Sequence, residues 1–325
     1  MDKKYDVVAL GEVLIDFTRA GISADGQKLF EQNPGGAPAN FLTAVAHFHK
    51  KTALIGKVGN DMHGLFLKSI IEAEGINTIG LLLDNNCFTT LAFVDLASNG
   101  ERIFSFARKP GADTQLETKE LPKQLLQNTK IFHIGSLSLT TDPARESTYF
   151  AMKIAKQAGA WISYDPNYRA NLWPSQNAAV SEMRNMLRYS DMVKVSDEEC
   201  FLLTGEKNFE KGAQKILDEG ATFVAVTLGK DGALIASKEG TRIVKGFAVE
   251  SVDTTGAGDS FWGGLVSSFI ESGKQLCDIT LREWEEFATV RNAVAALCVG
   301  KRGGIPSIPT AESVNEFLKT KIQSL

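Results

Sequence analysis

Short, continuous apolar runs recur along the chain and alternate with longer amphipathic stretches. The runs cover residues 7–10, 131–135, 161–165, 192–195 and 223–228. Continuous apolar runs are typical of strands that are buried on both faces of a parallel sheet. Helical patterns accompany them at residues 143–159, 208–220 and 260–272. The alternation predicts an α/β fold with a central, mainly parallel sheet flanked by helices on both faces.

Two segments depart from this rhythm. Residues 89–96 and 102–108 alternate between apolar and polar around the turn sequence SNG at 98–100, which predicts a β-hairpin. The segment 13–33 is similar, with Gly21 and Gly26 marking turns. Together, inserted segments of about 13–33 and 88–110 are expected to form a small β lid over the carboxyl ends of the main strands. Because no linker or repeat interrupts the pattern, residues 1–325 are expected to form a single domain.

Composition narrows the classes of function. The chain has 325 residues and a formal net charge of -4, so it has no basic bias that would hold nucleic acid or a membrane surface. It has neither an apolar run of 18 residues nor an N-terminal signal-peptide pattern, and a cytoplasmic location is expected. The four cysteines and four histidines show no metal-ligand spacing, and the cysteines are interpreted as reduced thiols.

The stretch DTTGAGDSF, from Asp253 to Phe261, changes from a strand-like to a helical pattern at its glycines. Backbone N–H groups can converge at glycines, and the N-terminus of a helix carries partial positive charge, so this turn is suited to bind phosphate oxygens. Asp259 then lies in the first helical turn, where a carboxylate can accept a proton from an attacking alcohol. The alternative is an ordinary helix start with an acid that matches the helix dipole.

A second glycine turn lies far upstream, in NPGGAPAN at residues 33–40. Gly35 and Gly36 permit close approach of a ligand to the main chain, and Pro38 is a residue that starts helices. Asn40 would lie in the first turn and offer its amide to a hydroxyl group. The alternative is a turn followed by a helix cap.

The two glycine turns together resemble the two signature patterns of the PfkB, or ribokinase-like, family of carbohydrate kinases. They occur in the family's order, and the resemblance runs from GEVLID at 11–16 to the C-terminal helix. It implies ATP-dependent transfer of a phosphoryl group to a sugar hydroxyl. It also implies a ribokinase-like fold, in which a small β lid closes over the sugar.

The resemblance assigns roles to individual positions. Asp259 matches the catalytic base, and the anion hole matches Gly256, Ala257 and Gly258. The sugar-binding positions are Asp16, Gly35, Gly36 and Asn40. The positions near ATP are Lys194, Glu199, Thr227, Gly229, Gly232 and Asn292. A monovalent cation, usually potassium, would be held by Asp253 and Thr255.

One departure concerns Mg²⁺. The family often carries an N-x-x-E motif that is linked to magnesium and phosphate, whereas this chain has Ser196 in place of the Asn and keeps Glu199. Glu199 would act on the metal through water, since Mg²⁺ often retains several waters. The alternative is that the acidic residues 197–199 only stabilise the start of a helix.

The acceptor is suggested by DPNYRANLWPS at residues 165–175, after a predicted strand. Arg169 offers five donors to hydroxyl, carboxylate or phosphate oxygens. The combination of GGAPAN with DPNxRxxLW is most similar to fructokinases, and 2-keto-3-deoxygluconate kinases share a similar segment. Ribokinases usually have GGKGAN at the first site, where this chain has GGAPAN, so ribose is disfavoured as the acceptor. Arg108 leaves the lid hairpin and would either neutralise transferring phosphate or form a surface salt bridge.

The expected reaction is therefore phosphorylation of D-fructose, at O6, by MgATP. The alternatives are a 2-keto-3-deoxygluconate kinase and a non-catalytic sugar-binding homologue. A P-loop nucleotidase is disfavoured because GxxxxGK[ST] does not occur, and a dehydrogenase is disfavoured because the late glycine turn lacks the third glycine of GxGxxG. The expected partners are the sugar and ATP, with a homodimer formed through the exposed edge of the lid.

Overall fold

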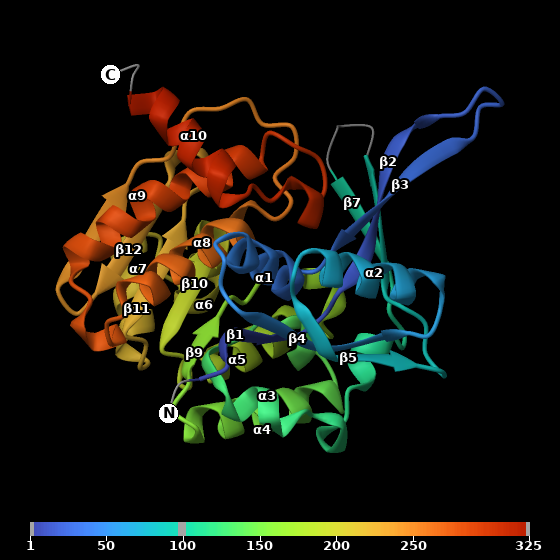
Figure 1. Ribbon diagram of the computed structural model, residues 1–325, viewed down its shortest axis with the longest axis horizontal. Helices are drawn as coiled ribbons and strands as arrows, with labels where there is room; N and C mark the ends of the chain where they lie inside the picture. The colour runs from blue at the N-terminus through green and yellow to red at the C-terminus, as the bar shows by residue number, and fades with distance from the viewer. Residues whose placement is uncertain (1–2, 97–101, 323–325) are drawn as a thin grey trace.

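The computed structural model describes residues 3–96 and 102–322, and its centre is a nine-stranded sheet (Figure 1). The strand order is β13-β12-β11-β10-β9-β8-β1-β4-β5. Neighbouring strands from β11 to β5 pair in parallel, and β12 and β13 add in antiparallel orientation. The strands are β1 (Tyr5–Leu10), β4 (Thr52–Gly59), β5 (Asn77–Asp84), β8 (Thr129–Ile134), β9 (Trp161–Tyr164), β10 (Met192–Ser196), β11 (Phe223–Thr227), β12 (Ala233–Ser237) and β13 (Gly240–Val244). All five apolar runs are strands of this sheet, which confirms the predicted fold class.

Helices cover both faces of the sheet, and each face has its own apolar core. One core includes residues of α3 (Lys123–Gln127), α4 (Ala144–Gln157), α5 (Gln176–Leu187), α6 (Asp197–Thr204) and α7 (Phe209–Asp218). The other includes residues of α1 (Ala37–His47), α2 (Met62–Ala73), α8 (Ala257–Ser272) and α9 (Leu281–Cys298). The last helix, α10 (Ala311–Ile322), packs against α9. In the described part of the chain, no helix has the length and apolarity needed to span a bilayer.

The expected small lid is a separate four-stranded sheet in the order β3-β2-β6-β7. Its strands are β2 (Leu14–Ile22), β3 (Lys28–Gly35), β6 (Leu91–Leu96) and β7 (Arg102–Ala107). In Figure 1 this sheet stands to one side of the central sheet. The predicted turn at 98–100 lies outside the described residues.

Candidate active site

A cleft of about 1150 Å³ lies between the lid and the carboxyl ends of the central strands. Residues of both sheets line it, so the lid forms one wall. Most of the residues selected from the sequence lie on its surface: Asp16, Gly36, Asn40, Arg169, Lys194, Glu199, Thr227, Asp253, Thr255, Gly256, Gly258 and Asp259. Gly35 and Ala257 are chain neighbours of lining residues. The sequence therefore predicted one cleft from segments that are far apart in the chain.

The late glycine turn is the N-terminus of α8, as expected. Gly256 precedes the helix with φ 77°, a left-handed conformation that glycine adopts without strain, and no side chain caps the helix there. The Ala257 N–H donates to the Thr254 carbonyl at 3.3 Å, and the N–H groups of Gly256 and Gly258 beside it are suited to bind an anion. A Cβ on Gly258 would lie 2.9 Å from the Lys194 ammonium, which places that cation beside the turn.

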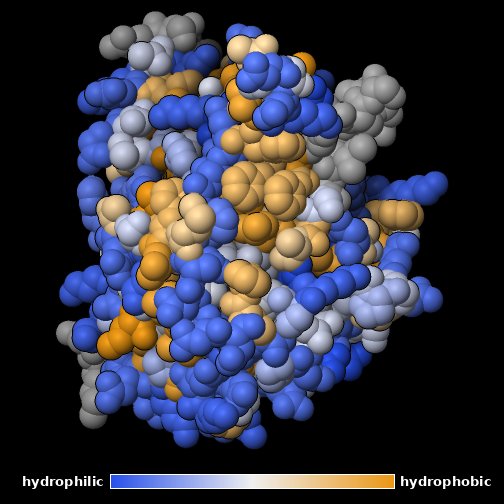
Figure 2. Space-filling model, turned by 90° about the vertical axis from the view of Figure 1, so that its right-hand side faces the viewer, coloured by the Kyte–Doolittle hydropathy of each residue, from blue (hydrophilic) through white to orange (hydrophobic). Residues whose placement is uncertain are grey.

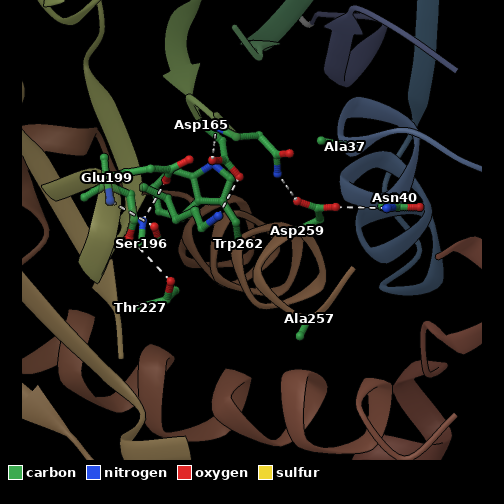
Figure 3. A network of polar contacts seen from close by, with 12 residues as sticks. Ala37, Asn40, Asp165, Ser196, Glu199, Thr227, Ala257, Asp259 and Trp262 are labelled. Atoms are coloured by element: carbon green, nitrogen blue, oxygen red, sulfur yellow. Dashed lines mark hydrogen bonds and ion pairs between the residues drawn. The ribbon is translucent and has the colours of Figure 1, made fainter. Parts of the chain in front are cut away.

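The Asp259 carboxylate is held between two amides from different elements (Figure 3). Asn40, in the first turn of α1, donates to Oδ2 at 2.9 Å, and Asn167 donates to Oδ1 at 3.0 Å. Asp259 is 6% exposed, and burial raises its pKa against the opposing influence of the Lys194 ammonium and the Asn40 amide. A buried, oriented carboxylate with a raised pKa is what a general base requires.

Lys194 forms a buried ion pair behind this carboxylate. Its ammonium donates to Asp165 Oδ2 at 2.8 Å, and both side chains are at most 5% exposed. Burial lowers the pKa of Lys194, but Asp165, Glu199 and Asp259 together raise it above its ordinary value. Lys194 is therefore a fixed positive charge at the anion-binding turn.

The upstream glycine turn is packed so closely that side chains do not fit. A Cβ on Gly36, which has φ 115°, would lie 2.6 Å from the Glu12 carbonyl oxygen. A Cβ on Gly35 would lie 2.7 Å from Asp16 Oδ2. Glu12 also accepts the Ala37 N–H at 3.0 Å, which fixes the start of α1. The turn therefore sets the positions of Asp16 and Asn40 relative to each other.

Asp16 lies on the lid strand β2 and lines the cleft. Burial raises its pKa to about 6, while the Arg169 guanidinium opposes that shift and Asp253 adds to it. Arg169 also lines the cleft and is exposed. The two side chains offer an acceptor and a set of donors to a polyhydroxyl ligand.

Asp253 and Thr255 form a compact turn ahead of α8. Asp253 Oδ1 accepts from the Thr255 N–H and hydroxyl group at 2.9 and 2.8 Å, and Oδ2 accepts from the Gly303 N–H at 3.2 Å. Asp253 is 8% exposed. The Asp253 carboxylate and the Thr255 hydroxyl are oxygen ligands of the kind that a hard cation prefers.

Ser196 and Glu199 open α6 with a capping box. The Ser196 hydroxyl accepts from the Glu199 N–H at 3.1 Å, and Glu199 Oε2 accepts from the Ser196 N–H at 2.8 Å. Glu198, in the same turn, is exposed and lines the cleft. The described residues contain no group of three or more His, Cys, Asp or Glu side chains that would hold a metal alone. Mg²⁺ binds through phosphates, waters and one or two carboxylates, and the exposed Glu198 carboxylate on the cleft surface fits such a role.

Three other nucleotide-site candidates lie outside the cleft lining. Gly229 begins a short 3-10 turn after β11. Gly232 ends that turn with φ 101°, and a Cβ there would lie 2.1 Å from the Val244 carbonyl oxygen. Asn292 donates to the same carbonyl at 3.2 Å and to that of Lys245 at 3.0 Å. Gly232 and Asn292 thus meet at one segment, and their roles toward ATP stay predictions.

Arg108 has a different position from the one that the sequence suggested. Its guanidinium is buried and does not line the cleft. It pairs with Asp113 at 2.7 Å, donates to the Leu137 carbonyl at 2.9 Å and donates to the Thr140 hydroxyl at 2.9 Å. Because these contacts take up its donors, neither phosphate neutralisation nor a surface salt bridge describes it. Arg108 anchors the end of lid strand β7 to the central domain.

We expect Arg108→Ala to lower the free energy of unfolding by about 3–5 kcal/mol, because it leaves Asp113 as a buried charge without its partner. Urea denaturation measures this loss. Arg145→Ala is the control, since Arg145 pairs with Asp142 where both side chains are about two-fifths exposed, and about 1 kcal/mol or less is expected. Equal effects of the two substitutions would contradict the anchoring role of Arg108.

Asn167 is the site residue that the sequence interpretation missed. It lies in the same DPNYR segment as Arg169, and its backbone has φ 47°, which is uncommon for a residue other than glycine. An Asn three residues beyond the end of the buried strand β9 was the available signal, because ligand-binding groups gather at the carboxyl ends of parallel strands.

Comparison with known sequences decides the family. The profile described as "pfkB family carbohydrate kinase" matches residues 4–311. The chain belongs to this family. Fructokinase-2 of Oryza sativa subsp. japonica is 42% identical over 316 residues, which cover 96% of this chain and 93% of the relative.

Solved structures agree with this assignment. A fructokinase from Xylella fastidiosa with bound ATP superposes with a TM-score of 0.89 at 30% identity, covering 97% of this chain and 98% of the other. A fructokinase double mutant from Vibrio cholerae O395, bound to fructose, ADP and potassium ion, has a TM-score of 0.87 at 32% identity and covers 98% and 99%. The ribokinase-like fold with a β lid is thereby established for this pfkB carbohydrate kinase.

Proposed function

We propose that this carbohydrate kinase is an ATP-dependent fructokinase that phosphorylates D-fructose at O6. The observation that carries the proposal is the arrangement at α8: a buried carboxylate, Asp259, stands in the first turn of a helix whose N-terminus has no side-chain cap and faces the cleft. Asn40, on the neighbouring helix α1, contacts that carboxylate. The choice of fructose rests on the full-length relatives that carry this name.

In the proposed mechanism, Asp259 accepts the proton of the attacking hydroxyl, while Asn40 and Asn167 fix the direction of its lone pairs. The sugar is held by Asp16, Asn40, Arg169 and the backbone at Gly35 and Gly36. The N–H groups at residues 256–258 and the Lys194 ammonium stabilise the charge on the transferred group. Closure of the lid excludes water, which limits hydrolysis of ATP.

Two ions complete the proposed site. Glu198 and Glu199 would hold Mg²⁺ through water, and the ion would supply neutralisation of phosphate charge. Asp253 and Thr255 would hold K⁺, which would supply positive charge beside the anion-binding turn. Thr227, Gly229, Gly232 and Asn292 are the proposed residues on the ATP side.

A panel of acceptors tests the substrate. ADP release is measured in one coupled assay with fructose, 2-keto-3-deoxygluconate, ribose and a nucleoside. We expect kcat/KM to be highest for fructose. Activity on 2-keto-3-deoxygluconate alone would show that this sugar, and not fructose, is the substrate. Absence of ADP release with every acceptor would indicate a non-catalytic homologue.

The pH dependence of the rate tests the ionised form of the site. Asp16 and Asp259 must be deprotonated to accept hydrogen bonds or a proton, and burial raises the pKa of both. We therefore expect kcat/KM for fructose to fall as the pH is lowered through about 6, well above the ordinary value of about 3.9 for Asp. A rate that stays constant down to about pH 4.5 would contradict this.

We also propose that two copies associate through the lid. Figure 2, viewed from the lid side of the molecule, shows apolar side chains gathered on this face. On the lid strands, Phe30 and Phe93 are in edge contact and are 37% and 39% exposed. The lid also has two edge strands, β3 and β7, that are available to pair with a symmetric second copy.

Light scattering tests this association. The wild type should have twice the 35.3 kDa chain mass, and Phe93→Asp should have the mass of one chain. A monomeric wild type would refute the association.

A further inference from the structure

Glu199 makes one contact that the start of its helix does not explain. Its Oε2 accepts from the Ser196 N–H within the capping box, but its Oε1 accepts from the Tyr168 N–H at 2.7 Å. Tyr168 is 31 residues away in the chain, in the loop that follows β9. Glu199 is 7% exposed, so both bonds lie where water competes little.

The Tyr168 N–H belongs to a backbone turn that needs support. Asn167, just before it, has φ 47°, a conformation that costs energy for a residue with a side chain and persists only where its surroundings enforce it. On the other side, the Asn167 N–H donates to Asp165 Oδ1 at 3.2 Å. The turn is therefore held at both ends by carboxylates, those of Asp165 and Glu199.

This turn carries the side chains that face the reacting groups. Asn167 donates to Asp259, and Arg169 lines the cleft near Asp16. Glu199 itself lies in the first turn of α6, which directly follows the carboxyl end of β10, where Ser196 is opposite Thr227. In Figure 3, Ser196, Glu199 and Thr227 lie on one side of the polar network and Asp259 and Asn40 on the other, with Asp165 between them.

We propose that Glu199 is a positioning residue that holds the Asn167 turn from the nucleotide side of the cleft and thereby orients the base and the sugar-binding arginine. The proposal rests on the proposed function and deepens it. Because each carboxylate oxygen accepts one backbone N–H group, the orientation of Glu199 is set by the main chain at Ser196 and Tyr168. Its main effect is on the acceptor side of the reaction.

The test compares Glu199→Gln and Glu199→Asp with Asp197→Asn. Gln has one acceptor oxygen for two N–H groups, and Asp keeps the charge but is one methylene too short to span both. We expect each to lower kcat and to raise the KM for fructose, so that kcat/KM falls at least about tenfold, the scale of one lost hydrogen bond to a charged group. The KM for ATP and the half-saturating Mg²⁺ concentration should change less than about threefold. Asp197, exposed in the same helical turn, should leave all of these within about twofold when changed to Asn.

Two results would overturn the proposal. Full activity of Glu199→Asp beside an impaired Glu199→Gln would indicate that only the charge is needed. A shifted Mg²⁺ requirement with an unchanged KM for fructose would indicate a metal role.

A double-variant cycle gives a second test. Glycine adopts φ 47° without strain, so in an Asn167→Gly background the further change Glu199→Gln should cost less than in the wild type. Additive losses would show that Glu199 does not act through Asn167. Absence of fructose phosphorylation by the wild type would instead refute the proposed function.

Discussion

Replacing Asp259 by Asn lowers kcat for fructose at least about 100-fold, the lower end of what removal of a general base costs. The amide has nearly the same shape, but it cannot accept the proton of the attacking hydroxyl. Binding of fructose and ATP should be retained, because the other cleft residues are unchanged. A coupled assay measures kcat, and isothermal titration measures the two affinities.

A matched control for this substitution is Glu146→Gln. Glu146 is also an acid in the first turn of a helix, α4, but it is exposed and does not line the cleft. It should leave kcat within about twofold. Near-full turnover of the Asp259 variant would exclude its role as the base.

The second large effect is expected for Asn40→Asp. Asn40 Nδ2 lies 2.9 Å from Asp259 Oδ2, so the substitution puts a second carboxylate against the first. Two carboxylates at this distance cannot both ionise easily, and one of the pair acquires a strongly raised pKa. At neutral pH we expect kcat/KM to fall at least about tenfold, because each unit of pKa above the pH costs tenfold in the ionised base. The pH–rate profile measures the effect.

The direction of the pH effect separates electrostatics from simple damage to the site. The Asn40→Asp rate should recover as the pH rises and the pair becomes ionised, so its acid limb lies above that of the wild type. Asn40→Ala, which removes the amide without adding charge, should not move the limb upward. An equal, pH-independent loss in both variants would refute the proposed contact between Asn40 and an ionisable base.

The main strands and both glycine turns were predictable from the sequence because their signals are local. Continuous apolar runs marked β1 and β8–β11, and glycines marked the starts of α1 and α8. The pairing of Lys194 with Asp165 was not predictable, since it depends on β9 and β10 lying side by side with Met192 opposite Ser163. Neither was the burial of Arg108, because its partners come from two further segments.

The role of Asn167 could not be predicted from the sequence for a different reason. Its chemistry at the site depends on a left-handed backbone and on a contact with Asp259, which lies on the distant helix α8. The capping box at Ser196 had a recognisable pattern, S-x-x-E, but the second bond of Glu199 to Tyr168 had none. Local patterns thus placed the reacting groups, and the fold determined what holds them.

The most direct test of the account is the NMR spectrum of the product formed from ATP and ¹³C-labelled fructose. We expect a single phosphorylated sugar in which the C6 carbon shows coupling to phosphorus, formed by the wild type and nearly absent with Asp259→Asn. Phosphorus coupling at C1 would contradict the proposed acceptor atom. A spectrum of unchanged fructose would contradict the proposed fructokinase activity itself.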